Sequence, residues 1–337
     1  MMRTTALGTG GPVSSVQGLG CMGMSDFYVG AGADRTESLA TLGHALDIGV
    51  THWDTSDMYG TGENERLLGA FFRGGRRDEV LLATKFGIDR NPEEGARGIR
   101  GDAEYVRRAC DASLARLGVE TIDLYYMHRR DTEVPIEETV GAMAELVAAG
   151  KVRHLGLSEV TAKEIHAAAA VHPIAAIQAE WSLFARDIEE SVVPAAREVG
   201  AAVVPYSPLG RGFLSARYAS FAELPEDDTR RLQPRFNGEN AEANATLLVP
   251  LREVAGKRGA TPAQIALAWI QQRAEVWDMP VVPIPGTTKR TRLDENAAAV
   301  DIVLTDDELA LLDPISAQVA GERYHVMTHT YVGPGRE

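Results

Sequence analysis

Cysteine, long apolar runs and targeting signals are all scarce in this sequence of 337 residues. The two cysteines, Cys21 and Cys110, lie far apart and have no neighbouring histidine or cysteine, so they form neither a zinc-ligand pattern nor a disulfide framework. We expect both thiols to be small buried hydrophobic groups. No stretch reaches the ~18 consecutive apolar residues of a membrane span. The first residues lack a basic segment followed by an apolar run, so no secretory signal is expected and the cytoplasm is the default location.

Positive charge is also scarce, because 34 Lys and Arg stand against 48 Asp and Glu, for a formal net charge of −14. A polyanion would be repelled and the chain has no dense basic run, which argues against nucleic acid as a partner. An anionic ligand would therefore need local positive groups. A Gly-x-Gly-x-x-Gly turn between a strand and a helix is missing too, since Gly8-Thr-Gly-Gly precedes the regular elements; this argues against a Rossmann domain.

Strand-like and helix-like segments alternate strictly along the chain, which predicts an α/β fold with a parallel sheet. We expect eight strands, at 16–22, 49–53, 80–84, 122–127, 152–158, 175–181, 201–207 and 281–285. Helices are expected at 35–48, 63–72, 102–117, 135–150, 161–171, 188–199, 239–258, 289–299 and 305–315. The stretch 87–101 reads as an exposed loop, and 208–261 as a long functional loop after the seventh strand. The pattern predicts one (β/α)8 TIM-barrel domain over residues 1–337.

Polar side chains stand at or just beyond the ends of three consecutive predicted strands. Asp54 and Tyr59 follow the second strand, Lys85 the third and His128 the fourth. Taken singly, each has an ordinary interpretation as a turn aspartate, a packed aromatic, a solvated lysine or a core histidine. Neighbouring strand ends of a parallel barrel meet at one face, where catalytic groups gather. The joint spacing therefore predicts one catalytic site.

Together with Gly156-Leu-Ser, Tyr206-Ser-Pro-Leu-Gly-Arg-Gly and Ile284-Pro-Gly-Thr-Thr-Lys, these four residues resemble the motifs of the aldo-keto reductases. The resemblance covers roughly residues 14–312 and is nearest to the plant and bacterial branch that includes perakine reductase. It implies an N-terminal hairpin over residues 1–15 that closes one end of the barrel. We further expect the tail 317–337 to fold over the mouth, after the last helix. The implied activity is NADPH-dependent reduction of aldehydes or ketones.

Such a reduction needs a proton donor beside the carbonyl oxygen, and the resemblance gives this role to Tyr59. A phenol with a pKa of ~10 is a weak acid at neutral pH. An ammonium group about 4 Å away would favour the phenolate by up to ~4 kcal/mol, so we expect Lys85 to lower the pKa of Tyr59. Asp54 would keep Lys85 charged, and a neutral His128 would orient the carbonyl.

The nicotinamide cofactor is expected along the later strands. Ser158 and Gln178 can hold its carboxamide, Tyr206 offers a flat face to its ring, and the following glycine-rich loop can present backbone donors to the pyrophosphate. The resemblance puts the adenosine end near the eighth strand, where the basic cluster at 289–292 would bind the 2′-phosphate of NADP. The full expected set is Ser158, Gln178, Tyr206, Ser207, Leu209, Arg211, Gly212, Ile284, Gly286, Thr287, Thr288, Lys289, Arg292, Glu295 and Asn296. Many family members have Asn where Glu159 stands, so Glu159 is assigned no cofactor contact.

The partner is expected to be a small aldehyde or ketone, and no metal site is expected. Its pocket would be lined by Phe27, Tyr28, Met58, Phe86, Arg129 and Trp181, which suggests a partly aromatic substrate with Arg129 facing any anionic group. Two alternatives stay open. One is a nucleotide-sensing regulatory subunit of the potassium-channel β type, which shares fold and tetrad. The other is a Schiff-base lyase built on Lys85, although the adjacent Asp54 argues against a neutral amine.

Overall fold

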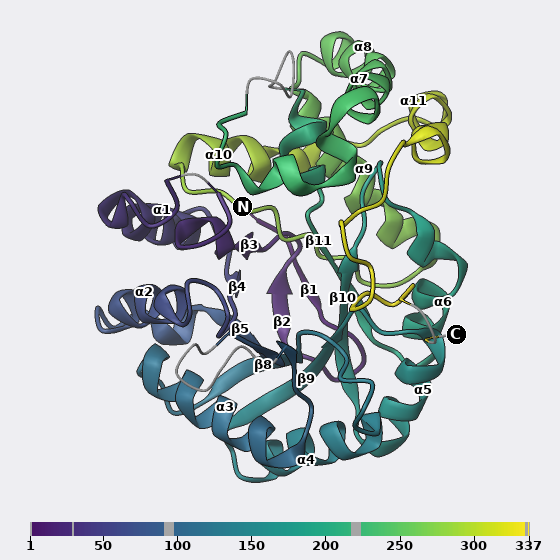
Figure 1. Cartoon of the computed structure of the whole chain (residues 1–337). Helices are drawn as coiled ribbons and strands as arrows, with labels where there is room; N and C mark the ends of the chain where they lie inside the picture. Colours follow the sequence, from purple (N-terminus) through teal and green to yellow (C-terminus); the bar gives the residue numbers. More distant parts are fainter. Residues whose placement is uncertain (1, 29, 91–97, 217–223, 334–335, 337) are drawn as a thin grey trace.

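A seven-stranded parallel sheet forms most of a barrel wall in the computed structural model, with helices packed around its outside (Figure 1). The structure describes residues 2–28, 30–90, 98–216, 224–333 and 336. The strand order β11-β10-β9-β8-β5-β4-β3 follows the chain, so consecutive barrel strands are neighbours and their carboxyl ends meet at one face. The strands are β3 (Leu19–Gly20), β4 (His52–Asp54), β5 (Leu81–Phe86), β8 (Ile122–Met127), β9 (Val152–Ser158), β10 (Ile174–Glu180) and β11 (Ala202–Tyr206).

The segment 281–286 closes the barrel between β11 and β3, where the eighth strand was expected, and a single parallel bridge joins it to each. The N–H groups of Val282 and Ile284 donate to carbonyls of β11 at 2.9 and 3.1 Å. On the other edge, Pro283 and Pro285 have no N–H and only accept hydrogen bonds from the β3 side, at 2.9 and 3.3 Å. Because proline removes every second donor, this segment completes the barrel without a regular ladder.

Helices follow the strands around the barrel, as the alternation predicts (Figure 1). Asp102 accepts from the N–H of Tyr105 at the start of α3, and Thr161, Thr261 and Thr305 form capping boxes with Glu or Gln three residues later, which fixes four helix starts. The outer helices are α1 (Arg35–Asp47), α2 (Glu63–Phe72), α3 (Ala103–Leu117), α4 (Ile136–Ala148), α5 (Ala162–Val171), α6 (Val192–Glu198), α9 (Pro262–Trp277) and α10 (Arg290–Ala298). None of the helices in the described ranges is both long and apolar enough to cross a membrane.

Several expected helices and strands have different bounds in the structure. The helix expected at 239–258 is two helices, α7 (Gly238–Thr246) and α8 (Val249–Arg258), because Pro250 cannot continue a helix from the preceding turn. The expected first strand is reduced to β3 and a 3-10 turn. The helix expected at 188–199 is a 3-10 turn, η4 (Asp187–Glu190), followed by α6. That expected at 305–315 is α11 (Asp306–Leu312), followed by a 3-10 turn at Asp313–Gln318.

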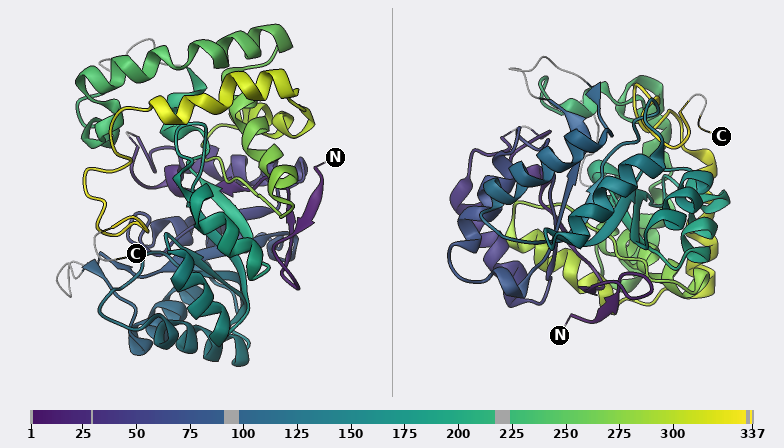
Figure 2. Two further views of the ribbon diagram at one scale, coloured as in Figure 1. Left: turned by 90° about the vertical axis from the view of Figure 1, so that its right-hand side faces the viewer. Right: turned by 90° about the horizontal axis from the view of Figure 1, so that it is seen from below.

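Two short hairpins lie outside the barrel wall. β1 (Thr4–Ala6) pairs antiparallel with β2 (Val13–Ser15), which confirms the expected N-terminal hairpin. The hairpin and the C-terminal tail lie on opposite sides of the molecule, so the tail is at the mouth (Figure 2). In the stretch expected to be a plain loop, β6 (Ile88–Asp89) pairs with β7 (Gly98–Ile99); residues 91–97 lie outside the described ranges. Both cysteines are free and buried, as expected.

The side chains of β5 show how strand alternation places the site. Leu82 and Phe86 point outward into the main apolar core between sheet and helices, whereas Leu81 and Ala83 belong to a smaller apolar cluster inside the barrel. Because side chains alternate between the two faces of a strand, Lys85 shares the inner face of Leu81 and Ala83. The strand therefore carries an ammonium group into the interior of the barrel, just beneath its mouth.

Packing inside the barrel yields a first prediction. A methyl group on Gly156 of β9 would overlap the ring of Tyr126. Gly156→Ala should therefore lower the free energy of unfolding by ~1–3 kcal/mol, the usual cost of overpacking. Gly141→Ala is the control, because a methyl there on α4 meets nothing within 4 Å and should stabilise the helix by ~0.5–1 kcal/mol. Urea unfolding of both variants measures the effects, and a Gly156→Ala protein as stable as the parent would contradict this packing.

Candidate active site

The structure brings Asp54, Tyr59, Lys85 and His128 together at the carboxyl ends of β4, β5 and β8. Lys85 Nζ donates a short hydrogen bond to Asp54 Oδ1, and another to the carbonyl of Thr55 at 2.9 Å. The ammonium nitrogen lies 5.2 Å from the ring centroid of Tyr59. The rings of Tyr59 and His128 meet edge to face, with centroids 5.8 Å apart. The four groups therefore form one buried cluster.

The Lys85–Asp54 ion pair is shielded from water, with side chains 0% and 3% exposed. Burial lowers the pKa of Lys85, and the carboxylate of Asp54 opposes that shift. Gln178 Nε2 donates to the second carboxylate oxygen of Asp54 at 2.8 Å, so both oxygens are hydrogen-bonded. These hydrogen bonds offset part of the desolvation cost of burying the ion pair. The ion pair argues against Schiff-base chemistry, because loss of the Lys85 proton would leave the Asp54 carboxylate buried without its cation.

The pKa of Tyr59 differs from the sequence-based expectation. Burial, and then the charge on Asp54, raise the pKa of Tyr59 well above its ordinary value, while Arg129 opposes them. The expected lowering by Lys85 is therefore wrong for this structure, because desolvation of a fully enclosed phenolate outweighs the nearby cations. Tyr59 keeps its proton at neutral pH, which suits a group that donates it only when negative charge develops beside it.

His128 is held as a neutral ring. Burial, then the charges of Lys85 and Arg129, lower the pKa of His128 well below its ordinary value. Its Nδ1 lies 3.0 Å from the hydroxyl of Ser56, which also accepts from the N–H of Met58 at 3.3 Å. Ser56 was not among the residues expected in the site, although its place between Asp54 and Tyr59 was the available signal. Its hydroxyl fixes the orientation of the imidazole.

Three residues expected at the nicotinamide also lie at this mouth. Ser158 ends β9, Gln178 lies on β10 and Tyr206 ends β11. The side-chain amide of Gln178 is oriented by the hydrogen bond that its Nε2 donates to Asp54. Arg129 joins the group: its Nη1 lies 3.4 Å from Ser158 Oγ, and its guanidinium lies 5.9 Å from the ring centroid of Tyr206. A half-buried cation thus stands between the tetrad and Tyr206.

The loop after β11, from Ser207 through Leu209 to Gly212, has an unusual backbone. Ser207, Arg211 and Gly212 adopt positive φ angles of 49°, 55° and 92°. For non-glycine residues this conformation costs about 1–3 kcal/mol, and such residues cluster at functional sites. Arg211 is anchored by an ion pair with Glu180 at 2.9 Å. The loop is therefore held firmly beside Tyr206.

Around the end of segment 281–286, Ile284 lies inside the barrel and Gly286 touches β3. A methyl on Gly286 would come within 3.1 Å of the carbonyl of Gly20, so this approach favours glycine. Thr287 accepts from the N–H of Lys289 at 3.1 Å and Thr288 accepts from Thr41 at 3.3 Å, which fixes the turn into α10.

The basic cluster at the start of α10 divides into paired and unpaired cations. Arg290 forms an ion pair with Glu37 at 3.2 Å. Lys289 and Arg292 are exposed, and no ion pair joins either of them to a residue of the described ranges. Glu295 accepts from the hydroxyl of Thr261 at 2.6 Å, and Asn296 is buried. Lys289 and Arg292 are thus the cations of this cluster that are free to bind a ligand.

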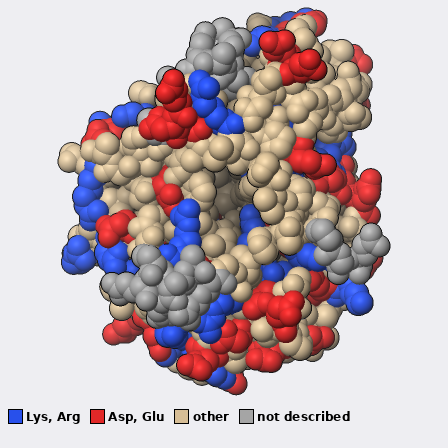
Figure 3. All heavy atoms as spheres, in the orientation of Figure 1, with Lys and Arg blue, Asp and Glu red and all other residues tan. Residues whose placement is uncertain are grey.

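Of the residues expected to line the substrate pocket, Phe27 lies against the tetrad, Met58 is its neighbour in sequence, and Tyr28 lies in the next shell. The ring of Phe27 meets that of Tyr59 edge to face at 6.4 Å. Tyr28 lies under the guanidinium of Arg230 at 5.5 Å, and Met58 is buried in the same loop as Tyr59. The space-filling view shows a hollow at the centre of this face with basic side chains at its edge (Figure 3).

Phe86 and Trp181 do not reach the mouth. Phe86 stacks on Tyr125 in the core outside the barrel, with centroids 5.0 Å apart. Trp181 is fully buried in the same core and donates from its indole nitrogen to Glu189 at 2.9 Å. Both follow from alternation, since each lies one residue beyond an inward-pointing position. The expectation that they line the pocket does not fit the structure.

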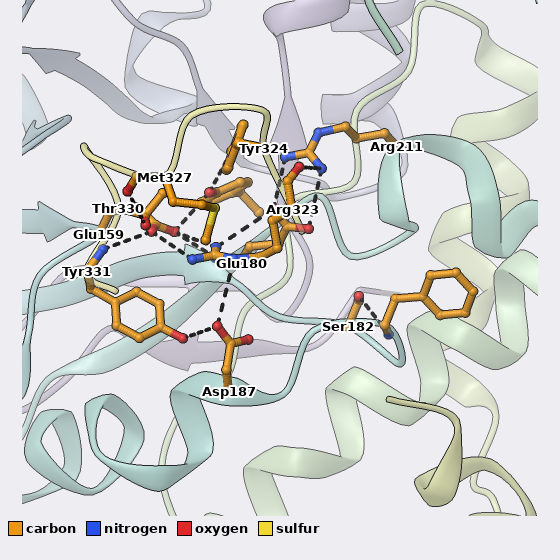
Figure 4. Close-up of polar contacts among 12 residues, drawn as sticks. Glu159, Glu180, Ser182, Asp187, Arg211, Arg323, Tyr324, Met327, Thr330 and Tyr331 are labelled. Carbon is orange, nitrogen blue, oxygen red and sulfur yellow. Dashed lines mark hydrogen bonds and ion pairs between the residues drawn. The ribbon is translucent and has the colours of Figure 1, made fainter. Parts of the chain in front are cut away.

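The C-terminal tail adds residues that the sequence analysis did not assign. Arg323 contacts Glu159 and Glu180 at the ends of β9 and β10 (Figure 4). Tyr324 contacts Tyr206 at the end of β11. The tail has no periodicity, so nothing in the sequence indicated which of its side chains point inward. Its position over the mouth agrees with the expectation.

Comparisons with known proteins agree on one family. The aldo/keto reductase family model matches residues 18–317. A glycerol dehydrogenase from Gluconobacter oxydans is 28% identical, with 95% of this chain and 96% of that chain covered and a TM-score of 0.82. An aldo-keto reductase from Bacillus halodurans, solved in a holo form, is 27% identical over 100% of both chains, with a TM-score of 0.76. An aldo/keto reductase from Klebsiella pneumoniae, in complex with NADP and acetate, is 28% identical over 96% and 99%, with a TM-score of 0.70. These matches favour an oxidoreductase over a regulatory subunit.

Acid sensitivity of the mouth is a second prediction. Burial alone would raise the pKa of Glu159, but the charges of Arg323 and Arg129 lower it to about 2. A depressed pKa contributes stability above the ordinary value of 4.5, and that contribution is lost as the pH falls towards about 2. Glu159→Gln should therefore destabilise the protein at pH 7, by up to ~3–5 kcal/mol, and less as the pH falls from about 5.

Urea unfolding at several pH values checks this. Glu145→Gln is the control, because it removes only the exposed partner of Arg107 and should cost less than ~1 kcal/mol. A Glu159→Gln protein whose deficit is independent of pH would contradict the assignment.

Proposed function

The chain belongs to the aldo/keto reductase family, and on that premise we propose that it reduces aldehydes or ketones to alcohols with NADPH. The observation that carries the proposal is the buried Lys85–Asp54 pair beside Tyr59 and His128 at the mouth of the barrel. A proton donor, a cation and a neutral hydrogen-bonding ring stand there within one water-poor cluster. This is the set of groups that carbonyl reduction requires.

The residues around the mouth fit a nicotinamide cofactor that carries a 2′-phosphate. The hydroxyl of Ser158 and the amide of Gln178 would hold the carboxamide, and Tyr206 would face the ring. Exposed Lys289 and Arg292 would bind the phosphate, since the third cation of that cluster is already paired with Glu37. NADP bound to the Klebsiella pneumoniae relative supports the same choice of cofactor.

Each residue of the tetrad then has a distinct task. The bound cofactor supplies a hydride to the carbonyl carbon. Tyr59 donates its phenolic proton to the carbonyl oxygen, so that an alcohol forms and a phenolate is left. Lys85, kept in place by Asp54, favours that phenolate electrostatically until solvent returns the proton. His128, neutral and oriented by Ser56, donates a hydrogen bond that positions the carbonyl.

Two finer assignments, the number of domains and the branch of the family, are also proposals. Residues 1–337 are proposed to form one domain, with the tail as part of the mouth. Membership of the branch that includes perakine reductase is likewise a proposal, and it rests on the motif resemblance.

Removal of the phenolic hydroxyl tests the role of Tyr59. Tyr59→Phe should lower kcat by ~10² or more, the usual scale for loss of a general acid. Binding of NADPH should change little, because the hydroxyl is needed only as charge develops on the substrate oxygen. Aldehyde reduction followed by NADPH absorbance gives kcat, and protein fluorescence gives the cofactor Kd. Activity within a few-fold of the parent would remove Tyr59 from the mechanism.

Cofactor choice tests the basic cluster. A charge-assisted hydrogen bond contributes ~1.5–3 kcal/mol, so Lys289→Ala with Arg292→Ala should weaken NADPH binding at least ~10- to 100-fold. NADH has no 2′-phosphate and should bind almost as before. Arg290→Ala is the matched control, because that cation is occupied by Glu37 and its loss should alter neither Kd much. If the double variant weakened the binding of NADPH and NADH equally, the cluster would not recognise the 2′-phosphate.

A further inference from the structure

Glu159 occupies a strained and fully enclosed position directly after Ser158. Its φ angle is 54°, in the left-handed region, and its side chain has no exposure. Oε1 accepts from the hydroxyl of Tyr206 at 2.9 Å. Oε1 and Oε2 also accept from Arg323 Nη1 and Nη2 at 3.1 and 3.2 Å (Figure 4). A carboxylate held from these sides cannot turn towards a carboxamide without breaking an ion pair. The role of Glu159 is therefore indicated by the two residues that it binds, Tyr206 and Arg323.

Arg323 is the residue that ties the tail to the barrel. It is 1% exposed. Besides its two hydrogen bonds to Glu159, its guanidinium lies 3.8 Å from the carboxylate of Glu180 and 3.8 Å from that of Asp187. These three carboxylates come from the end of β9, the end of β10 and η4, which follow one another along the chain. A buried guanidinium is tolerable only where such partners surround it. Its requirement for partners therefore fixes the register of a tail that has little regular structure.

Tyr206 is held on both sides by this arrangement. Its hydroxyl donates to Glu159 and lies 2.8 Å from the hydroxyl of Tyr324, the tail residue that follows Arg323. The ring of Tyr324 in turn lies under the guanidinium of Arg211 at 4.6 Å. Arg211 is paired with Glu180 and donates weakly to the carbonyl of Arg323 at 3.4 Å. The orientation of the Tyr206 ring thus depends on contacts from the tail and from the loop after β11.

We propose that Glu159 and Arg323 are positioning residues: their ion pair sets the ring of Tyr206 and holds the tail against the nicotinamide end of the cofactor site. The inference rests on the proposed function, because it treats Tyr206 as the surface that faces the nicotinamide. It explains why this chain has a glutamate beside Ser158. It also makes cofactor release dependent on this ion pair, since the tail contacts both Tyr206 and the loop expected to bind the pyrophosphate.

The first test measures cofactor release from Arg323→Lys and from a matched control. Lysine keeps the charge but loses the two-pronged contact with Glu159. The control, Arg336→Lys, makes the same change in the same tail at a buried arginine that contacts Glu164 at 2.6 Å and the carbonyl of Thr330 at 2.7 Å, and does not contact Glu159. We expect Arg323→Lys to release NADPH at least ~10-fold faster, which corresponds to a free-energy barrier to dissociation that is lower by ~1.4 kcal/mol. The release rate of Arg336→Lys should stay within about 2-fold of the parent. Stopped-flow fluorescence with NADPH alone gives both rates.

A double-mutant cycle separates positioning from general loosening of the fold. Tyr206→Phe removes the hydroxyl through which Glu159 would act. If the inference is right, Glu159→Gln should slow single-turnover reduction in the parent but have little further effect in the Tyr206→Phe background. Tyr324→Phe is the mildest change and should raise the NADPH release rate by ~3- to 10-fold, as expected for one hydrogen bond. It keeps the test valid if an ion-pair variant does not fold.

The outcomes are distinguishable. If the parent protein binds no NADPH, that result contradicts the proposed function and, with it, this inference. If the parent binds NADPH but Arg323→Lys and Tyr324→Phe release it as slowly as Arg336→Lys does, only the inference is overturned. Additive effects of Glu159→Gln and Tyr206→Phe would also overturn it, because they would show that Glu159 does not act through the Tyr206 hydroxyl.

Discussion

The ion pair between Lys85 and Asp54 is the constraint on which the mouth of the barrel depends. An isolated ammonium group inside the barrel, above Leu81 and Ala83, would carry a large desolvation cost. The carboxylate of Asp54 at the end of β4 offsets that cost, and Gln178 on β10 satisfies its second oxygen. Strands on different sides of the barrel are therefore joined through one carboxylate. The same pair places a fixed positive charge beside Tyr59, where carbonyl reduction needs it.

A second group of charges, buried or half-buried, organises the opposite side of the mouth. In a chain with a formal net charge of −14, Arg129, Arg211 and Arg323 are gathered at the ends of β8 to β11. Glu159 and Glu180 hold two of them and anchor the tail. Arg129 forms no ion pair with a residue in the described part of the chain. Basic side chains lie beside the hollow at the centre of this face, which favours an anionic cofactor despite the negative net charge (Figure 3).

Much of the fold followed from the sequence because the strands and helices carry strong local signals. Strands such as Ile122–Met127 and helices with capping residues such as Thr161 were located within a residue or two. The predicted strand ends in turn located Asp54, Tyr59, Lys85 and His128 at one face of the barrel. Long-range effects were harder to anticipate. The two prolines at 283 and 285 alter the closing strand, and a one-residue step in alternation turns Phe86 away from the mouth.

The tail contacts had no sequence signal at all. Arg323 and Tyr324 lie in a segment without periodicity, and their partners are more than a hundred residues away. The pKa of Tyr59 also depends on enclosure by the complete fold, which reversed the expected direction.

We propose that NADPH bound at this mouth transfers a hydride to a carbonyl carbon. The most direct measurement uses NADPH deuterated at the transferable C4 position of the nicotinamide, with an aldehyde substrate and mass spectrometry of the alcohol. The account predicts one deuterium on the carbinol carbon of the product, formed in step with NADPH oxidation. An unlabelled alcohol, or no oxidation of NADPH across a broad panel of aldehydes and ketones, would contradict it.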